Sequence, residues 1–132
     1  MKDIITFDHF KVTQDFGSVV QRVDDSMIES WKKIYGDNGV SADSEIPEGM
    51  MQALAMRAFL NLVTPRPPGN IHLGQTMRLH AVANLDDLIS VSVVCAGKQI
   101  RKERKIVQLA VSGRTDRGKA VFDGEMTLIW AA

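Results

Sequence analysis

Residues 47–63 combine a helix-forming composition with apolar side chains on nearly every side. From Met50 onward the only polar residues of this segment are Gln52, Arg57 and Asn61. A helix that is apolar all round must be enclosed by other structure or by a membrane. The segment is shorter than the roughly 20 residues that a membrane span needs, and it carries an arginine. We therefore expect a buried helix with a sheet curled around it.

Prolines and one acidic residue mark the expected ends of this helix. Pro47 suits a first helical position, and Pro65 closes the segment. Glu48 lies where the positive end of the helix macrodipole favours a negative charge. The central helix is therefore expected to begin near Pro47 and to end before Pro65.

Two irregular or extended stretches are expected before the central helix. Residues 5–23 mix polar and apolar positions, which predicts one extended segment, broken near Asp15–Gly17, at the edge of a sheet. Residues 37–47 hold turn formers and three acidic residues with few apolar anchors. This second stretch predicts a loop that runs into the central helix.

A short amphipathic helix is expected between these stretches. Its apolar residues, Met27, Ile28, Trp31, Ile34 and Tyr35, recur at helical spacing. Ser26 and Glu29 have the spacing of a capping box at its start. Gly36 provides a common helix ending.

The second half of the chain predicts four strands in series. From Ile71 onward the pattern of side chains repeats every second residue, which predicts a strand. His72 and His80 are expected on one face of this strand. The other face is expected to carry Ile71, Leu73, Gln75, Met77, Leu79 and Ala81. Three further runs, residues 88–97, 105–115 and 120–130, also predict strands. Tight connections between them imply an antiparallel meander. The expected fold class is therefore α+β, with one domain spanning residues 1–132.

Composition and charge restrict the class of partner and the setting. The 132 residues suffice for one compact domain, and 16 basic residues balance 16 acidic ones. Without a net field we expect no nucleic acid and no anionic membrane surface as partner. Cys95 is the only cysteine, and the first residues lack the pattern of a secretory signal, so a cytoplasmic setting is expected. Seven methionines, four of them between Met27 and Met56, either line an adaptable apolar cavity or fill the core.

Several kinds of chemistry have no motif in this sequence. There is no Gly-rich phosphate loop, nucleophile elbow or paired-cysteine zinc spacing. His72 and His80 are too far apart along one strand to share a metal ion, so we expect no metal and no cofactor. The basic run from Lys98 to Lys105, and Arg66 in the proline-rich connector, could bind phosphates of coenzyme A. A solvated hairpin explains the basic run better than phosphate binding does.

Short strings in a defined order resemble a known family. They run from about Asp24 to Trp130 and comprise Tyr35-Gly36-Asp37, Gly49, Pro68-Gly69 followed by Gln75, Arg78 and Leu79, then Leu85-Asp86-Asp87 and Gly124-Glu125-Met126. Their order and spacing resemble the hotdog-fold MaoC-like dehydratases, which include the (R)-specific enoyl-CoA hydratases. The resemblance implies an antiparallel sheet wrapped around one long helix. It also implies acyl thioester substrates, carried by coenzyme A or acyl carrier protein, and a homodimer or higher homo-oligomer with sites at the subunit junction.

The catalytic motif of this family is incomplete here. In the family a Gly-Asp pair is followed by any residue, Asn, Pro, any residue and His, and the Asp and His activate water. Asp37 occupies the aspartate position, but Ala42 occupies the histidine position. General acid or base catalysis contributes about 10²–10⁴-fold to a rate, so this loss should cripple hydration unless another group substitutes.

The resemblance also implies site residues around the start of the central helix. Glu48 stands where the family commonly has a histidine, and it is a candidate base; alternatively it is only an exposed charge at a helix start. The backbone amide of Gly49 would polarise the substrate carbonyl, as in the family, unless the glycine only lets the chain turn. Further substrate contacts are expected at Asn38, and along the helix at Gln52, Ala55 and Phe59. Core packing is the alternative for the helix residues.

Three functions remain open from the sequence. The first is a lyase that hydrates an enoyl thioester, or the reverse dehydration, with Asp37 and Gly49 at the site. The second is a hotdog thioesterase in which Glu48 activates water. The third is a non-catalytic acyl-thioester-binding or partner subunit. Ala42 favours the second and third, and the pattern along the whole chain favours the first.

Overall fold

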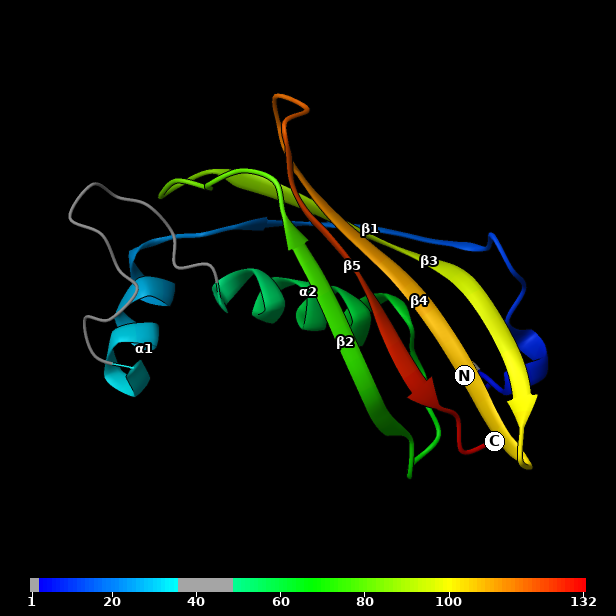
Figure 1. Ribbon diagram of the computed structural model, residues 1–132. Helices are drawn as coiled ribbons and strands as arrows, with labels where there is room; N and C mark the ends of the chain where they lie inside the picture. Colours follow the sequence, from blue (N-terminus) through cyan, green and yellow to red (C-terminus); the bar gives the residue numbers. More distant parts are fainter. Residues whose placement is uncertain (1–2, 36–48) are drawn as a thin grey trace.

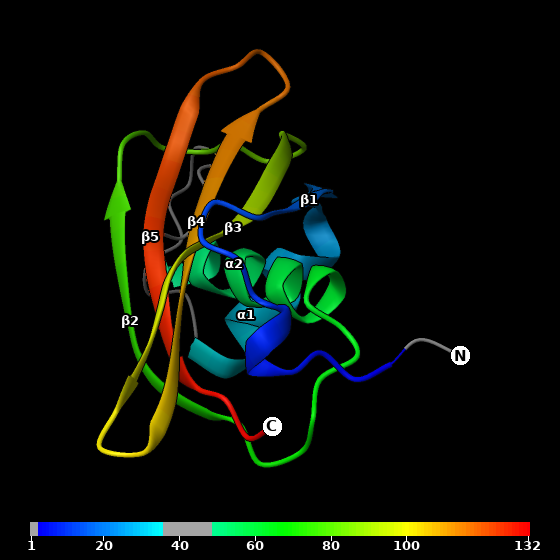
Figure 2. The same cartoon turned by 90° about the vertical axis from the view of Figure 1, so that its right-hand side faces the viewer.

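A computed structural model describes residues 3–35 and 49–132 (Figure 1). Its core element is α2 (Gly49–Leu62), and an antiparallel sheet of five strands curls around it (Figure 2). The other elements are a 3-10 helix (Phe7–His9), β1 (Asp15–Arg22), α1 (Asp25–Tyr35), β2 (Ile71–Leu79), β3 (Leu88–Arg101), β4 (Arg104–Thr115) and β5 (Ala120–Ile129). This α+β architecture, a sheet wrapped around a long helix, is the one predicted.

The central helix is buried on one side only. Leu54, Ala55 and Ala58 are fully buried and join the core formed with the inner face of the sheet. On the other side Arg57 and Leu60 are exposed. The prediction of a helix enclosed on every side is therefore too strong. A helix that the sheet covers from one direction leaves its opposite side for α1, solvent or a ligand.

The strand order of the sheet is β1-β3-β4-β5-β2. The strands β3, β4 and β5 follow one another as an antiparallel meander, as expected, and β1 lies at an edge, also as expected. The strand β2 pairs with β5 and not with β3, so the prediction of a four-strand meander is wrong for β2. Residues 80–87 carry the chain past the ends of two strands, a crossing of about 14 Å at the usual strand spacing.

A bulge in β2 changes which side chains face α2. The pairing with β5 shifts between His72 and Gly74. His72 lies opposite Leu128, and Gln75 lies opposite Met126; both partners are buried in the core cluster that includes residues of α2. Residues directly opposite on antiparallel strands point to the same face, so His72 faces α2 together with Gln75. The predicted sharing of one face by His72 and His80 is therefore wrong, because one inserted residue reverses the alternation before it.

The start of α1 is capped by Asp24 and not by Ser26, which corrects the predicted capping box. The Asp24 carboxylate accepts hydrogen bonds from the Ser26 hydroxyl at 2.8 Å and from the Met27 backbone N–H at 3.1 Å. These bonds, the Ser26 hydroxyl first, hold the pKa of Asp24 below its usual value. Ser26 lies one residue inside the helix, where its hydroxyl supports the cap.

Candidate functional site

Gly49 is the first residue of α2, and it is exposed. The first backbone N–H groups of an α-helix have no partner within the helix, so this end offers hydrogen-bond donors and a positive partial charge. The indole of Trp31, from α1, lies directly against this glycine. A Cβ atom at position 49 would come within 2.7 Å of Trp31 Cη2. Any side chain at position 49 would therefore require the indole to move.

A cavity of about 350 Å³, the α1–α2 cavity, opens beside this glycine. Trp31 and Met50, which neighbour Gly49, both form part of its wall. The complete lining is Ser26, Met27, Ser30, Trp31 and Ile34 from α1 with Met50, Ala53 and Arg57 from α2. Most of these side chains are apolar, so the cavity suits a hydrocarbon chain, with a single charge at Arg57.

A second cavity of about 370 Å³, the Arg66 cavity, lies at the opposite end of α2. Phe59 and Arg66 both line it, and the guanidinium carbon of Arg66 lies 5.4 Å from the centre of the Phe59 ring. Arg66 Nη1 donates hydrogen bonds to the carbonyl oxygens of Leu60 at 2.9 Å and Val63 at 2.8 Å. Arg66 therefore satisfies carbonyl groups at the end of the helix, where intrahelical donors are lacking.

The expected site residues fall into separate places. Asp37, Asn38, Ala42 and Glu48 lie outside the described residues. Within the described part, Gln52 is exposed, Ala55 is buried in the core and Phe59 lines the Arg66 cavity. The structure does not bring these three side chains into one lining with Gly49, because Ala55 packs in the core and Phe59 lies near the opposite end of α2.

The residues beside Gly49 were not foreseen. Met50, Ala53 and Arg57 are spaced by three and four positions, the repeat that aligns side chains on one helix face. Arg57 is also the only charged residue of α2. These two signals were present in the sequence, but the expected lining followed the neighbouring face. Trp31 was assigned only to the apolar face of its own helix.

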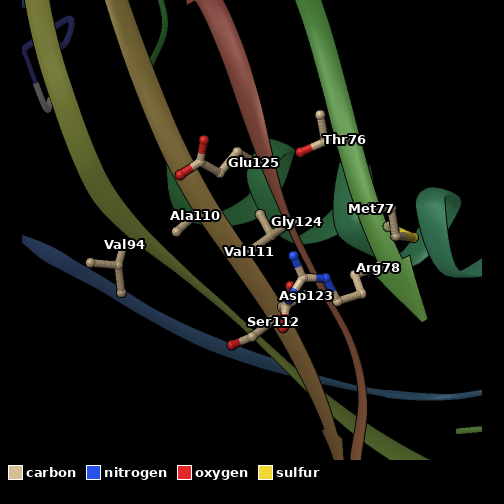
Figure 3. A pocket seen from close by; sticks show the side chains of 10 residues that line it. All are labelled: Thr76, Met77, Arg78, Val94, Ala110, Val111, Ser112, Asp123, Gly124 and Glu125. Atoms are coloured by element: carbon tan, nitrogen blue, oxygen red, sulfur yellow. The ribbon is translucent and has the colours of Figure 1, made fainter. Parts of the chain in front are cut away.

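A hollow of about 550 Å³ lies on the face of the sheet that points away from α2. Arg78, Asp123 and Glu125 give it a charged lining, and Ser112 and Thr76 add hydroxyl groups (Figure 3). At its border His80 Nε2 lies 2.6 Å from Asp123 Oδ2. Because the sheet separates this hollow from α2, its groups cannot reach a substrate held at Gly49.

The basic run forms the turn between β3 and β4, far from the start of α2 (Figure 1). Lys98 Nζ donates a hydrogen bond to the backbone carbonyl oxygen of Phe7 at 3.2 Å. The same nitrogen lies 4.7 Å from the centre of the Phe7 ring. Arg101, Lys102 and Arg104 are exposed. Within one chain this hairpin is therefore not positioned beside Gly49.

The remaining reactive groups offer no alternative chemistry in the described part of the chain. Cys95 is fully buried, and this burial raises the pKa of its thiol, so the thiol stays protonated and a poor nucleophile. Among residues 3–35 and 49–132, no group of three or more His, Cys, Asp or Glu side chains could hold a metal ion. No helix in those ranges is long and apolar enough to cross a bilayer.

Comparison with known proteins gives matches in structure only. No protein-family model matches the sequence, and a search of curated proteins gave no match. The R-hydratase PhaJ1 from Pseudomonas aeruginosa in its unliganded form is similar with a TM-score of 0.77 at 23% identity, over 96% of this chain and 86% of that chain. The MaoC-like dehydratase from Rhodospirillum rubrum is similar with a TM-score of 0.79 at 16% identity, over 97% of this chain and 98% of that chain.

A third similar structure is described as a different kind of enzyme. A hypothetical thioesterase protein with coenzyme A from Streptococcus pneumoniae is similar with a TM-score of 0.60 at 14% identity, over 90% of this chain and 82% of that chain. Together with the sheet wrapped around α2, these likenesses establish the architecture. The chain therefore has the hotdog fold that it shares with R-hydratases and MaoC-like dehydratases.

Proposed function

We propose that this protein binds an acyl thioester and acts as an enoyl thioester hydratase, or as the corresponding 3-hydroxyacyl dehydratase. The observation that carries the proposal is the position of Gly49. Its backbone lies at the exposed start of α2, beside a mostly apolar cavity of about 350 Å³. A thioester needs these two features together, a donor for its carbonyl oxygen and an apolar space for its acyl chain.

The chemistry proposed at this site follows from the end of the helix. The thioester carbonyl oxygen accepts a hydrogen bond from the amide at Gly49, and the positive end of α2 stabilises the negative charge that develops on that oxygen. Water then adds its oxygen to the β-carbon of the double bond while a base takes its proton. A proton returned to the α-carbon completes the hydration. We assign the base to Asp37, assisted by Glu48, with Asn38 contacting the substrate.

A thioesterase is the second candidate function. It is supported by Ala42, which stands where the resembling family has its catalytic histidine, and by the likeness to the hypothetical thioesterase protein. In that reaction Glu48 would direct water onto the carbonyl carbon, and the carbon–sulfur bond would break to release a free thiol. The same carbonyl position at Gly49 would serve both reactions.

The assembly proposed for the active protein is a homodimer paired through β2. This strand is an edge of the sheet, and it exposes Ile71 and Leu73 by 54% and 55%. An exposed apolar edge strand invites pairing with another strand, and a second copy of β2 would supply one. The carrier of the acyl group, coenzyme A or acyl carrier protein, would approach from the exposed side of Gly49.

One assay distinguishes the functions. Purified protein is incubated with enoyl-CoA and saturated acyl-CoA thioesters of several chain lengths, and loss of the double bond and release of free thiol are followed in parallel. Loss of the double bond without thiol release is the expected result. Thiol release from saturated thioesters would replace the hydratase by the thioesterase, and binding without either reaction would leave a non-catalytic binding subunit.

Two variants then test the assigned residues. Asp37→Asn keeps the size of the side chain and removes its charge, and we expect a loss of hydration of about 10²–10⁴-fold. Glu48→Gln makes the same change at the second position and should have a smaller effect on hydration. Hydration that survives unchanged in Asp37→Asn would remove this residue from the mechanism.

A further inference from the structure

The inference concerns Arg57, the only charged side chain of α2. This residue lies on the helix face of Met50 and Ala53, and with them it lines the α1–α2 cavity. Besides Arg57, the only polar residues in the lining of this cavity, as far as the structure describes it, are Ser26 and Ser30. The Arg57 side chain is exposed, and an acyl chain that fills the space beside it would remove water contacts from its charge.

Arg57 has no protein partner in residues 3–35 and 49–132: no hydrogen bond or ion pair involves its guanidinium there. Arg66, the arginine at the other end of the helix, contrasts with it, because it donates two hydrogen bonds to backbone carbonyls. The planar guanidinium of Arg57 carries five N–H donors in a fork that matches a carboxylate. These donors are available to a ligand in the α1–α2 cavity.

The spacing between Arg57 and Gly49 sets where such a ligand must carry its charge. The two positions are eight residues apart in α2. At 1.5 Å per residue they lie about 12 Å apart along the helix axis. A thioester with its carbonyl oxygen at Gly49 and its acyl chain along α2 would pass Met50 and Ala53 and bring its far end beside the guanidinium.

We propose that Arg57 binds an anionic group at the far end of the acyl chain. The substrates of this protein are then thioesters of acyl groups that end in a carboxylate, and Arg57 is the residue that selects them over plain alkyl chains. The proposal rests on the proposed acyl thioester site at Gly49. Its physical basis is that a methyl end group would strip water from the guanidinium and return no hydrogen bond, whereas a carboxylate accepts two.

The test compares pairs of enoyl-CoA substrates of equal chain length that end in a methyl or in a carboxylate group. For the wild-type protein we expect kcat/KM to favour the carboxylate member by about 10- to 100-fold at the best chain length, the range of one strong charged hydrogen bond. Arg57→Met keeps the length and helix propensity of the side chain. It should abolish this preference. Arg57→Lys keeps the positive charge but loses the planar, forked arrangement of donors, so it should retain part of the preference for the carboxylate member.

Arg78→Met is the matched control, because Arg78 lies on the sheet face away from α2. This variant should leave the preference unchanged. The proposal is overturned if the wild type turns over both members equally or prefers the methyl member. It is equally overturned if Arg57→Met retains the full preference.

A binding measurement separates this proposal from the proposed catalysis. Saturated acyl-CoA thioesters with methyl or carboxylate ends are titrated into the protein by calorimetry, which needs no turnover. Tighter binding of the carboxylate member, lost in Arg57→Met, supports the role of Arg57 even if no reaction occurs. Equal affinity for both members, or binding of neither, overturns the proposed role of Arg57. Hydration without a preference for either end group also overturns that role, but it still supports the proposed hydratase activity.

Discussion

At the residue scale, the contact between Trp31 and Gly49 connects two helices that are separated in the sequence by residues 36–48. The side chain missing from position 49 makes room for the indole, and the same indole forms a wall of the α1–α2 cavity. The geometry at the start of α2 therefore depends on a packing contact as well as on the backbone. A change at either residue should alter stability and the site together.

The first prediction concerns Gly49→Ala. The added methyl group would lie within 2.7 Å of Trp31 Cη2, so the indole must move. We expect a loss of about 1–3 kcal/mol in the free energy of unfolding, the usual cost of overpacking. Urea unfolding measures this loss. The double variant Gly49→Ala with Trp31→Leu should recover part of it, because the smaller side chain leaves space for the methyl group.

Gly74→Ala provides the control for that measurement. Gly74 lies in β2, and a Cβ atom there would meet no other atom within 4 Å. This variant should change the free energy of unfolding by at most about 0.5 kcal/mol. Equal stability of Gly49→Ala and Gly74→Ala would show that the Trp31 contact does not constrain position 49.

The sequence predicted individual site residues unevenly. Gly49 was identified at the start of the central helix, and the structure places it there. Arg57 and Trp31 were missed as cavity residues, because helical periodicity shows which residues share a face but not which face another helix leaves open. The packing of α1 decides that, and it depends on contacts that the pattern within either helix does not contain.

At the element scale, sequence patterns identified the types of element better than their neighbours. The alternation from Ile71 onward predicted a strand, and the structure has β2 there. The same alternation could not show that β2 pairs with β5, because both pairings bury one face and expose the other. Nor could it reveal the bulge between His72 and Gly74, which depends on the register with the partner strand.

The start of α1 allows a second prediction at this scale. Asp24 accepts two hydrogen bonds at the start of this helix, whereas the predicted cap was Ser26. Asp24→Ala should therefore lower the urea midpoint more than Ser26→Ala, since it removes the acceptor for the Met27 N–H as well as for the hydroxyl. A larger loss in Ser26→Ala would restore the predicted cap.

The stabilisation by Asp24 should depend on pH in a defined direction. Its pKa in the folded protein lies below the ordinary value of 3.8, chiefly because the Ser26 hydroxyl donates to the carboxylate. The charged form is therefore favoured in the folded state. Its contribution is present above pH 3.8 and is lost as the pH falls through the lower folded pKa. The difference in urea midpoint between wild type and Asp24→Ala should shrink over that range.

At the scale of the whole molecule, the two edges of the sheet differ in what they offer a partner. β2 forms one edge and β1 the other. β2 exposes three large hydrophobic side chains, Ile71, Leu73 and Leu79, whereas β1 exposes only Val20. A second copy would therefore pair at β2.

The last prediction tests this assembly with one charge at each edge. Leu73→Lys places a cation on β2 at a side chain exposed by 55%, and Val20→Lys places one on β1 at a side chain exposed by 63%. In an antiparallel pair of β2 strands related by a two-fold axis, each subunit would bring the new charge into the same interface, where burial without a partner is costly. Light scattering after size exclusion should give a dimer for the wild type and for Val20→Lys, and a monomer for Leu73→Lys. A dimer that persists in Leu73→Lys, or a wild-type monomer, would mean that copies do not associate through β2. A site at Gly49 would then have to be complete within one chain.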